Sequence, residues 1–188
     1  LWLIQESRRQ WIREGKEYSF GHLEQMAADA KPFKALIDPD APEFVPAGNI
    51  PERIRRCCRE SGQKVPENEA ELVRCINESL ALKYRMTLEE IKMCTGREYP
   101  AIHMVGGGTQ SGLLCQMTAN ACHCPVIAGP VEATVLGNAA VQLLAAGELR
   151  DLDQVRSVVG ASAKVSIYEP KDTDQWEQVY GQYKKMLE

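Results

Sequence analysis

The residues most able to do chemistry are three consecutive glycines, Gly106, Gly107 and Gly108, between a short apolar run and a helical pattern. Without side chains they let a ligand approach the backbone closely, and the free N–H groups and positive end of the following helix favour a phosphate. The spacing is not a dinucleotide fingerprint, because Ser111 stands at the third glycine, and no Lys follows as in a Walker A loop. A nucleotide site and a plain tight turn therefore both stay open. Thr109 and Ser111 are interpreted as helix caps in preference to ligand contacts.

A few other residues are of types that could bind a metal or take part in catalysis. We interpret Glu132 as a first-turn carboxylate stabilised by the helix dipole; the alternative is an acid that supports a metal or a ligand-contacting residue. Cys122, His123 and Cys124 give poor metal geometry, so buried thiols are predicted, with a metal or redox module as the alternative. His103 is predicted to be a hydrogen-bonded core residue. The sequence has no Ser/His/Asp order, paired carboxylates or H-E-x-x-H, so no catalytic residue and no metal ligand are predicted.

The composition excludes several classes of protein. Lys+Arg 22 against Asp+Glu 26 gives a formal net charge of -4, so no broad basic field favours a nucleic acid or an anionic membrane. No apolar run approaches the roughly 20 residues of a membrane helix, and no export signal is recognisable. Seven cysteines are too few for a disulfide scaffold and favour a reducing compartment, although one pair could oxidise. We expect a soluble, cytoplasmic protein.

Charge is unevenly distributed along the chain. Between Tyr99 and Gly147 the only charged residue is Glu132, and Gly, Ala, Val, Leu and Cys are abundant. We predict that this stretch is the buried centre around which the charged helices are wrapped, and that the chemistry lies there. The chain then divides into a helical part, 1–98, a β-α-β nucleotide core, 99–150, and a C-terminal strand and helix, 151–188.

Five helices are predicted in the first part from the 3.6-residue apolar period and from end signals. They are Leu1–Glu14, stopped by Gly15; a helix capped by Ser19; one from Asn49 to Gly62; one through Leu72–Leu80; and a short one from a Thr87–Glu90 capping box to Gly96. The prolines between Lys31 and Asn49 predict a connecting loop.

Strands are predicted in the remainder. The order is a strand at Ala101–Val105, a helix at Ser111–Cys122, a strand at Pro125–Ala128, a helix at Val131–Ala146, a candidate strand at Val165–Tyr168 and a C-terminal amphipathic helix around Trp176–Tyr183. This order predicts a parallel, right-handed β-α-β unit. Two such short strands cannot provide hydrogen-bond partners for all of their own backbone N–H and C=O groups, so further strands are expected upstream. The missing initial Met indicates a piece of a longer protein.

The nucleotide-binding half of the FGGY carbohydrate kinases is similar to two blocks of this chain: V-G-G-G-T-Q-S-G-L-L-C-Q at Val105–Gln116 and A-G-P-V-E-A-T-V-L-G-N-A-A-V-Q at Ala128–Gln142. The similarity runs from Leu1 to about Arg150. It includes L-W-L-I-Q-E at Leu1–Glu6, G-Q-K-V-P at Gly62–Pro66 and E-L-V-R-C-I-N-E-S-L-A-L-K-Y-R at Glu71–Arg85. The blocks at Leu1 and Glu71 discriminate among family members. The resemblance implies an α/β, actin-like (ribonuclease H-like) ATPase lobe, mostly helical here, that uses ATP and Mg²⁺ beside an N-terminal sugar-binding lobe. The discriminating blocks imply L-rhamnulose, phosphorylated at its 1-hydroxyl during rhamnose catabolism, as the acceptor.

The resemblance also implies roles for single residues. Gly107, with Gly106 and Gly108, would lie against the ATP phosphates and ribose, and Gln5 of the leading helix would face the nucleotide. Ser111 stands where many relatives carry an Asn that touches the base, although a hydroxyl reaches less far than an amide.

Two further implications concern oxidation and catalysis. Cys58 and Cys75 resemble a cysteine pair of the family that can oxidise; we predict reduced core thiols. The family's catalytic aspartate lies in sequence upstream of Leu1, so we expect this chain alone to be inactive. None of Asp38, Asp40, Asp151 and Asp153 is nominated as the base. The alternatives are the same lobe of another FGGY sugar or polyol kinase and a nucleotide-free assembly module.

Overall fold

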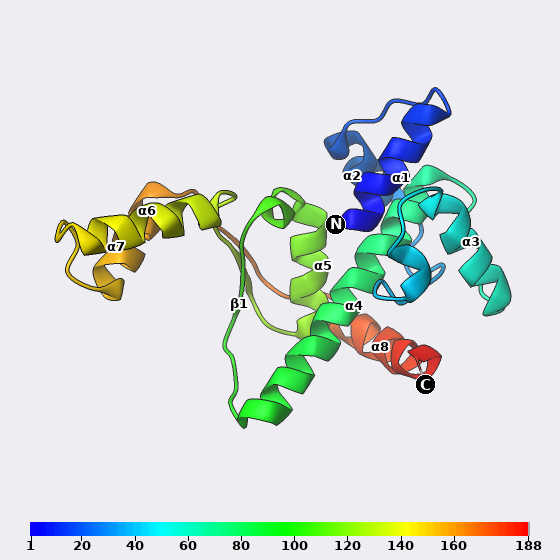
Figure 1. Ribbon diagram of the computed structural model, residues 1–188. Helices are drawn as coiled ribbons and strands as arrows, with labels where there is room; N and C mark the ends of the chain where they lie inside the picture. The colour runs from blue at the N-terminus through cyan, green and yellow to red at the C-terminus, as the bar shows by residue number, and fades with distance from the viewer. Residues whose placement is uncertain (188) are drawn as a thin grey trace.

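The N-terminal half of the chain is helical (Figure 1). The computed structural model describes residues 1–187 and places there α1 Trp2–Arg13, α2 Phe20–Asp29, the short 3-10 helix η1 Pro42–Phe44, α3 Ile50–Glu60 and α4 Glu69–Thr95. The predicted caps are confirmed, because the side chain of Ser19 accepts a hydrogen bond from the N–H of His22 and that of Asn49 from the N–H of Glu52. Gly96 ends α4 in the left-handed conformation, with φ 63°.

One long helix replaces two predicted helices. α4 has 27 residues and runs without interruption through Thr87 and Glu90, so the predicted capping box is wrong. The segment contains no Gly or Pro that would break it, and a Thr-x-x-Glu spacing inside a helix carries no cap. The helix starts instead at Asn68, whose side chain accepts from the N–H of Glu71. Neither α4 nor any other helix within residues 1–187 combines the length and apolar character needed to cross a membrane.

A three-stranded sheet follows, in the order β1 (Ile102–Met104), β2 (Val126–Ala128), β3 (Ser166–Tyr168). β1 and β2 are parallel and are joined through the short helix η2 (Gly107–Gln110) and α5 (Gly112–Cys122), which confirms the predicted β-α-β unit. β3 runs antiparallel to β2. The prediction for His103 is wrong: its side chain is exposed, because it shares an uncovered face of the sheet with Ile167, which is 63% exposed.

The core is built around α4 and α5. One apolar cluster joins α1, α2, α3 and α4 and includes Trp11 and Ile76. A second joins α4 and α5 to the predicted C-terminal helix, α8 (Thr173–Leu187), through Trp176 and Tyr183. A third packs α5 on the sheet through Cys115. Since α5 takes part in two of these clusters, the turn before it is held in place by both the helices and the sheet.

Two helices, α6 (Ala133–Ala145) and α7 (Leu152–Ser162), project away from the rest of the chain (Figure 1). Ala140 is the one buried residue of α6, α7 has none, and Val135 and Val141 are 62% and 64% exposed. The prediction that the whole charge-poor stretch is a buried centre is therefore wrong. A lack of charge lowers the cost of burial, but burial also needs a covering surface, and α1–α5 and α8 pack against one another instead. α7, which Asp151 caps, is a helix that the sequence analysis missed.

Candidate functional site

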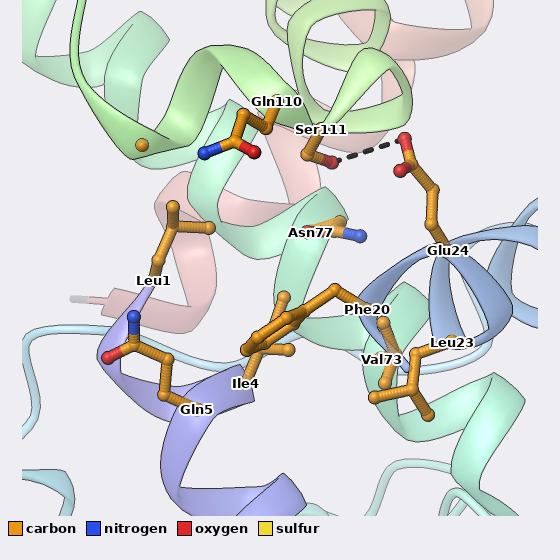
Figure 2. Close-up of a pocket in the computed structure, with 12 residues that line it drawn as sticks. Leu1, Ile4, Gln5, Phe20, Leu23, Glu24, Val73, Asn77, Gln110 and Ser111 are labelled. Carbon is orange, nitrogen blue, oxygen red and sulfur yellow. Dashed lines mark hydrogen bonds between the residues drawn. The ribbon is translucent and has the colours of Figure 1, made fainter. Parts of the chain in front are cut away.

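A cavity of about 330 Å³ opens beside the glycine-rich turn, between α1, α2, α4 and the start of α5 (Figure 2). Its size falls within the roughly 300–1,000 Å³ typical of small-molecule sites. The apolar wall consists of Leu1, Ile4, Phe20, Leu23 and Val73, and the polar side chains belong to Gln5, Glu24, Asn77, Gln110 and Ser111. The cavity thus offers apolar faces for a flat ring and a few polar groups for its edges.

The glycine-rich turn forms one end of this cavity through Gly107. Gly106 has φ 81°, a conformation that favours glycine, and its N–H donates to the carbonyl of Pro130 at 3.1 Å. The N–H groups of Gly107 and Gly108, at the start of η2, have no acceptor within that helix. The turn therefore has backbone donors available next to the cavity.

Thr109 does not act as the predicted helix cap. Its hydroxyl donates to the carbonyl of Gly106 at 2.7 Å and so closes the turn on itself. The prediction for Ser111 is confirmed, since its Oγ accepts from the N–H of Leu114 at 3.2 Å and caps α5.

A carboxylate that the sequence analysis missed, Glu24, lies at the start of α5. Its Oε1 accepts from the N–H of Leu113 at 2.6 Å and from the hydroxyl of Ser111 at 3.3 Å, as the dashed line in Figure 2 shows for the second contact. Of the groups that the sequence analysis considered for a phosphate, the start of α5 is therefore already engaged, because a side chain from α2 occupies it. No local signal marks Glu24, since its partner lies far along the chain.

Asn77 is the other missed polar residue. It lines the cavity, is 2% exposed, and its Oδ1 has no hydrogen-bond partner among the described residues. The sequence carries a usable signal here, because Asn77 interrupts the otherwise apolar stripe that includes Val73 and Ile76 on α4. A buried amide without a partner is costly unless a ligand or water satisfies it.

The predicted Gln5 also lines the cavity, next to Ile4 on α1. Phe20 of α2 lines the cavity as well, is 53% exposed, and has the guanidinium of Arg8 at 5.1 Å from the centre of its ring. The structure thus brings Gln5, Gly107 and Ser111 to one cavity, whereas Gly106 and Gly108 lie in the same turn without lining it.

The remaining candidates lie elsewhere. Glu132 is exposed at the start of α6 and its side chain makes no capping hydrogen bond. Within residues 1–187 no group of three or more His, Cys, Asp or Glu is arranged to hold a metal ion. Cys122 and Cys124 are half-buried rather than buried as predicted. Desolvation nevertheless raises the pKa of the Cys122 thiol to about 12 and that of Cys124 above its usual value. His123 adopts a left-handed conformation at the end of α5, with its Nε2 3.4 Å from an Arg85 nitrogen.

Cys58 and Cys75 are buried free thiols in the cluster that joins α1, α2, α3 and α4, as predicted. Each thiol changes the pKa of the other. The neighbouring Cys58 thiol and burial raise the pKa of Cys75, whereas the neighbouring Cys75 thiol lowers the pKa of Cys58.

Comparison with known proteins identifies the class that this fold and cavity represent. Residues 1–146 match the model of the FGGY family of carbohydrate kinases, C-terminal domain, and the chain belongs to this family. Among its relatives, rhamnulokinase from Bacteroides thetaiotaomicron is 38% identical over 187 residues, which is 100% of this chain and 38% of the relative. Rhamnulokinase from Enterococcus faecalis is 39% identical over 176 residues, 93% of this chain and 35% of the relative. The chain therefore spans little more than a third of the length of these relatives.

Solved structures support the same fold. Xylulose kinase from Rhodospirillum rubrum superposes with a TM-score of 0.67 at 15% identity, over 98% of this chain and 36% of that one. Plasmodium falciparum glycerol kinase with ADP gives a TM-score of 0.65 at 14% identity, over 94% of this chain and 35% of that one. The α/β, actin-like fold is thus confirmed; at these identities the likeness concerns the fold alone.

Proposed function

We propose that the chain is the ATP-binding C-terminal lobe of a rhamnulokinase, in which the whole enzyme transfers the γ-phosphoryl group of MgATP to the 1-hydroxyl of L-rhamnulose. The observation that carries the proposal is the cavity beside the glycine-rich turn, in a chain that resembles rhamnulokinases along its whole length. The proposed compartment is the reducing cytoplasm.

The residues around the cavity suit a nucleotide. Apolar side chains on α1 and α2 provide faces for the base, and Gly106, Gly107 and Gly108 provide close backbone contact for the ribose and phosphates. Gln5 faces the same space from α1. Ser111 contributes by holding the start of α5, since its hydroxyl is engaged on both sides.

Phosphoryl transfer also needs a cation and a base. Mg²⁺ would supply charge neutralisation on the phosphates; since residues 1–187 present no cluster of ligands for it, it would enter with the nucleotide. We assign no catalytic residue in this chain, and the N-terminal sugar-binding lobe of the enzyme would supply the base and the sugar site. The chain alone is then expected to form no rhamnulose 1-phosphate.

Nucleotide binding can be tested directly by titrating the chain with MgADP and MgATP in a calorimeter at millimolar concentration. Gly107→Val should weaken binding, because no atom lies within 4 Å of an added Cβ and the larger side chain would stand at the cavity rather than disturb the fold. Gly137→Val, on exposed α6, has equally free space and should bind like the parent chain. Absence of heat for the parent chain would favour the assembly module, for which the exposed face of α6 offers a surface.

The acceptor needs a separate test. The fold is shared with xylulose and glycerol kinases, so a sibling FGGY kinase acting on another sugar or polyol is the competing candidate. The full-length enzyme should phosphorylate L-rhamnulose in preference to D-xylulose, glycerol and gluconate in a coupled ADP-release assay. Preference for any other acceptor would contradict the substrate proposal while leaving nucleotide binding in place.

A further inference from the structure

The helix α2 forms one wall of the cavity but contributes little to the core. It supplies Phe20, Leu23 and Glu24 to the lining, as Figure 2 shows. Its buried residues are Leu23 and Ala27. A helix of ten residues is marginal without tertiary contacts. The position of this wall therefore depends on the other contacts that hold α2 against the rest of the chain.

Arg74 of α4 holds the C-terminal end of α2. Its Nη1 donates to the carbonyl of Ala27 at 3.0 Å and to the carbonyl of Ala28 at 2.9 Å. Both carbonyls belong to the last turn of α2, where carbonyl groups lack partners within the helix and the helix dipole favours a positive charge. The two contacts thus fix the end of α2 that is opposite to Phe20.

Glu78 in turn holds the guanidinium of Arg74. Its Oε1 accepts from the Nε of Arg74 at 2.7 Å, and its Oε2 accepts from the N–H of Phe33 at 2.9 Å, so both oxygens are anchored. The side chains of Arg74 and Glu78 are 14% and 1% exposed, and solvent therefore screens the pair weakly. Because Glu78 binds Nε, Nη1 is left for the two carbonyls of α2.

The pair acts at a distance from the nucleotide space. Neither Arg74 nor Glu78 belongs to the described residues that line the cavity. Phe20 lies about 11 Å from Ala27 along α2, at 1.5 Å per residue. Apart from the long-range field of its charge, any influence of Arg74 on the cavity must therefore pass through α2.

The middle of α2 connects the pair to the start of α5 as well. Glu24 lies four residues before Ala28. Its Oε1 accepts from the N–H of Leu113 at 2.6 Å and from the hydroxyl of Ser111 at 3.3 Å. A displacement of α2 would therefore move the wall of the cavity and separate Glu24 from α5 at the same time.

We propose that Arg74 and Glu78 are positioning residues for the cavity, because they hold α2 in the place from which its side chains form the wall. The inference rests on the nucleotide binding proposed above. Without the two contacts of Arg74, α2 would sample other positions. The apparent affinity for a nucleotide would then fall in proportion to the fraction of molecules in which the wall is in place.

Arg74→Met tests this by removing the guanidinium at similar length. Its dissociation constant for MgADP, measured by equilibrium dialysis, should be about 10-fold higher, as for a site whose competent arrangement is about one-tenth populated. Arg74→Lys keeps the charge and a donor but loses the fork, so its affinity should lie between those of Arg74→Met and the parent. Arg156→Met removes an equal charge from an exposed position of α7 and should bind like the parent chain.

Two further measurements separate positioning from a general loss of stability. Hydrogen exchange followed by mass spectrometry should be faster in α2 of Arg74→Met, whereas the amides of α3 should exchange as in the parent chain. In a chain that also carries Phe20→Ala, the effect of Arg74→Met on MgADP binding should be smaller by a factor of at least about 2, because part of the wall is already absent. Independent effects would multiply instead.

The outcomes distinguish this inference from the proposed function. If folded Arg74→Met binds MgADP as tightly as the parent chain, the positioning proposal is wrong and the nucleotide site stands. Equal acceleration of exchange in α2 and α3 would also contradict it, since the substitution would then act on the whole fold. No binding by the parent chain would overturn both proposals. If Arg74→Met does not fold, Arg74→Lys decides the question, and parent-like affinity with parent-like exchange in α2 would refute the inference.

Discussion

The stability of the chain should fall as pH rises through 7, because of one buried carboxyl on α4. Glu78 is 1% exposed, accepts from the Arg74 guanidinium at 2.7 Å, and accepts from the N–H of Phe33 at 2.9 Å. Burial outweighs these partners and raises the pKa of Glu78 from 4.5 to about 7. The folded chain therefore keeps a proton, between pH 4.5 and 7, that the unfolded chain has released.

The difference between the pKa of Glu78 in the folded chain and in the unfolded chain sets the direction and the size of the change in stability with pH. The pKa of Glu78 is higher in the folded chain, so its contribution to the free energy of unfolding is most favourable below pH 4.5 and is lost as pH rises through 7. The shift from 4.5 to about 7 corresponds to at most about 3 kcal/mol. Urea unfolding followed by circular dichroism at pH values from 5 to 8 measures this fall.

Glu78→Gln removes the ionisation and keeps an acceptor for the N–H of Phe33, so the fall between pH 5 and 8 should become smaller by about the same amount. Glu90→Gln, at an exposed position of the same helix, removes an equal charge and should keep the parent profile. A Glu78→Gln profile as steep as that of the parent would refute the reasoning, since the titrating group would then lie elsewhere.

Two further predictions concern stability. Trp176→Ala should lower the free energy of unfolding by about 3–5 kcal/mol, because the side chain is 4% exposed and its ring packs edge-on against Phe33 with centroids 4.9 Å apart. An unchanged urea midpoint would show that Trp176 does not anchor α8. Gly96→Ala should lower the free energy of unfolding by about 1–2 kcal/mol, since a side chain is unfavourable at φ 63°. Gly181→Ala, in α8 and with no atom within 4 Å of an added Cβ, is the matched control in the same urea titration.

Helix ends and short strands could be predicted because their signals are local. Ser19 and Asn49 cap the helices that follow them, and the apolar run before the glycines becomes β1. The extent of α4 could not be predicted from Thr87 and Glu90, because a cap signal acts only where the chain enters a helix from a non-helical conformation.

The candidate site also contains some residues that could be predicted from the sequence and others that could not. Gln5 and Gly107, for which the family resemblance implied nucleotide contacts, both line the cavity, and the contacts themselves stay a prediction. Glu24 could not be found from its neighbours in sequence, because its role depends on the packing of α2 against the start of α5. The outward position of α6 was missed for a related reason: composition indicates which segments tolerate burial, whereas packing decides which segments are covered.

The continuity of α4 turns a local change at the cavity into a displacement at a distant point. Asn77 and Thr95 lie on the same uninterrupted helix, so the span between them is about 27 Å at 1.5 Å per residue. A tilt of about 5° around Asn77 would swing the Thr95 end by about 2 Å, and with it the start of the segment that leads into β1. The helix thus links the residues that border the cavity to the start of the segment that leads into β1.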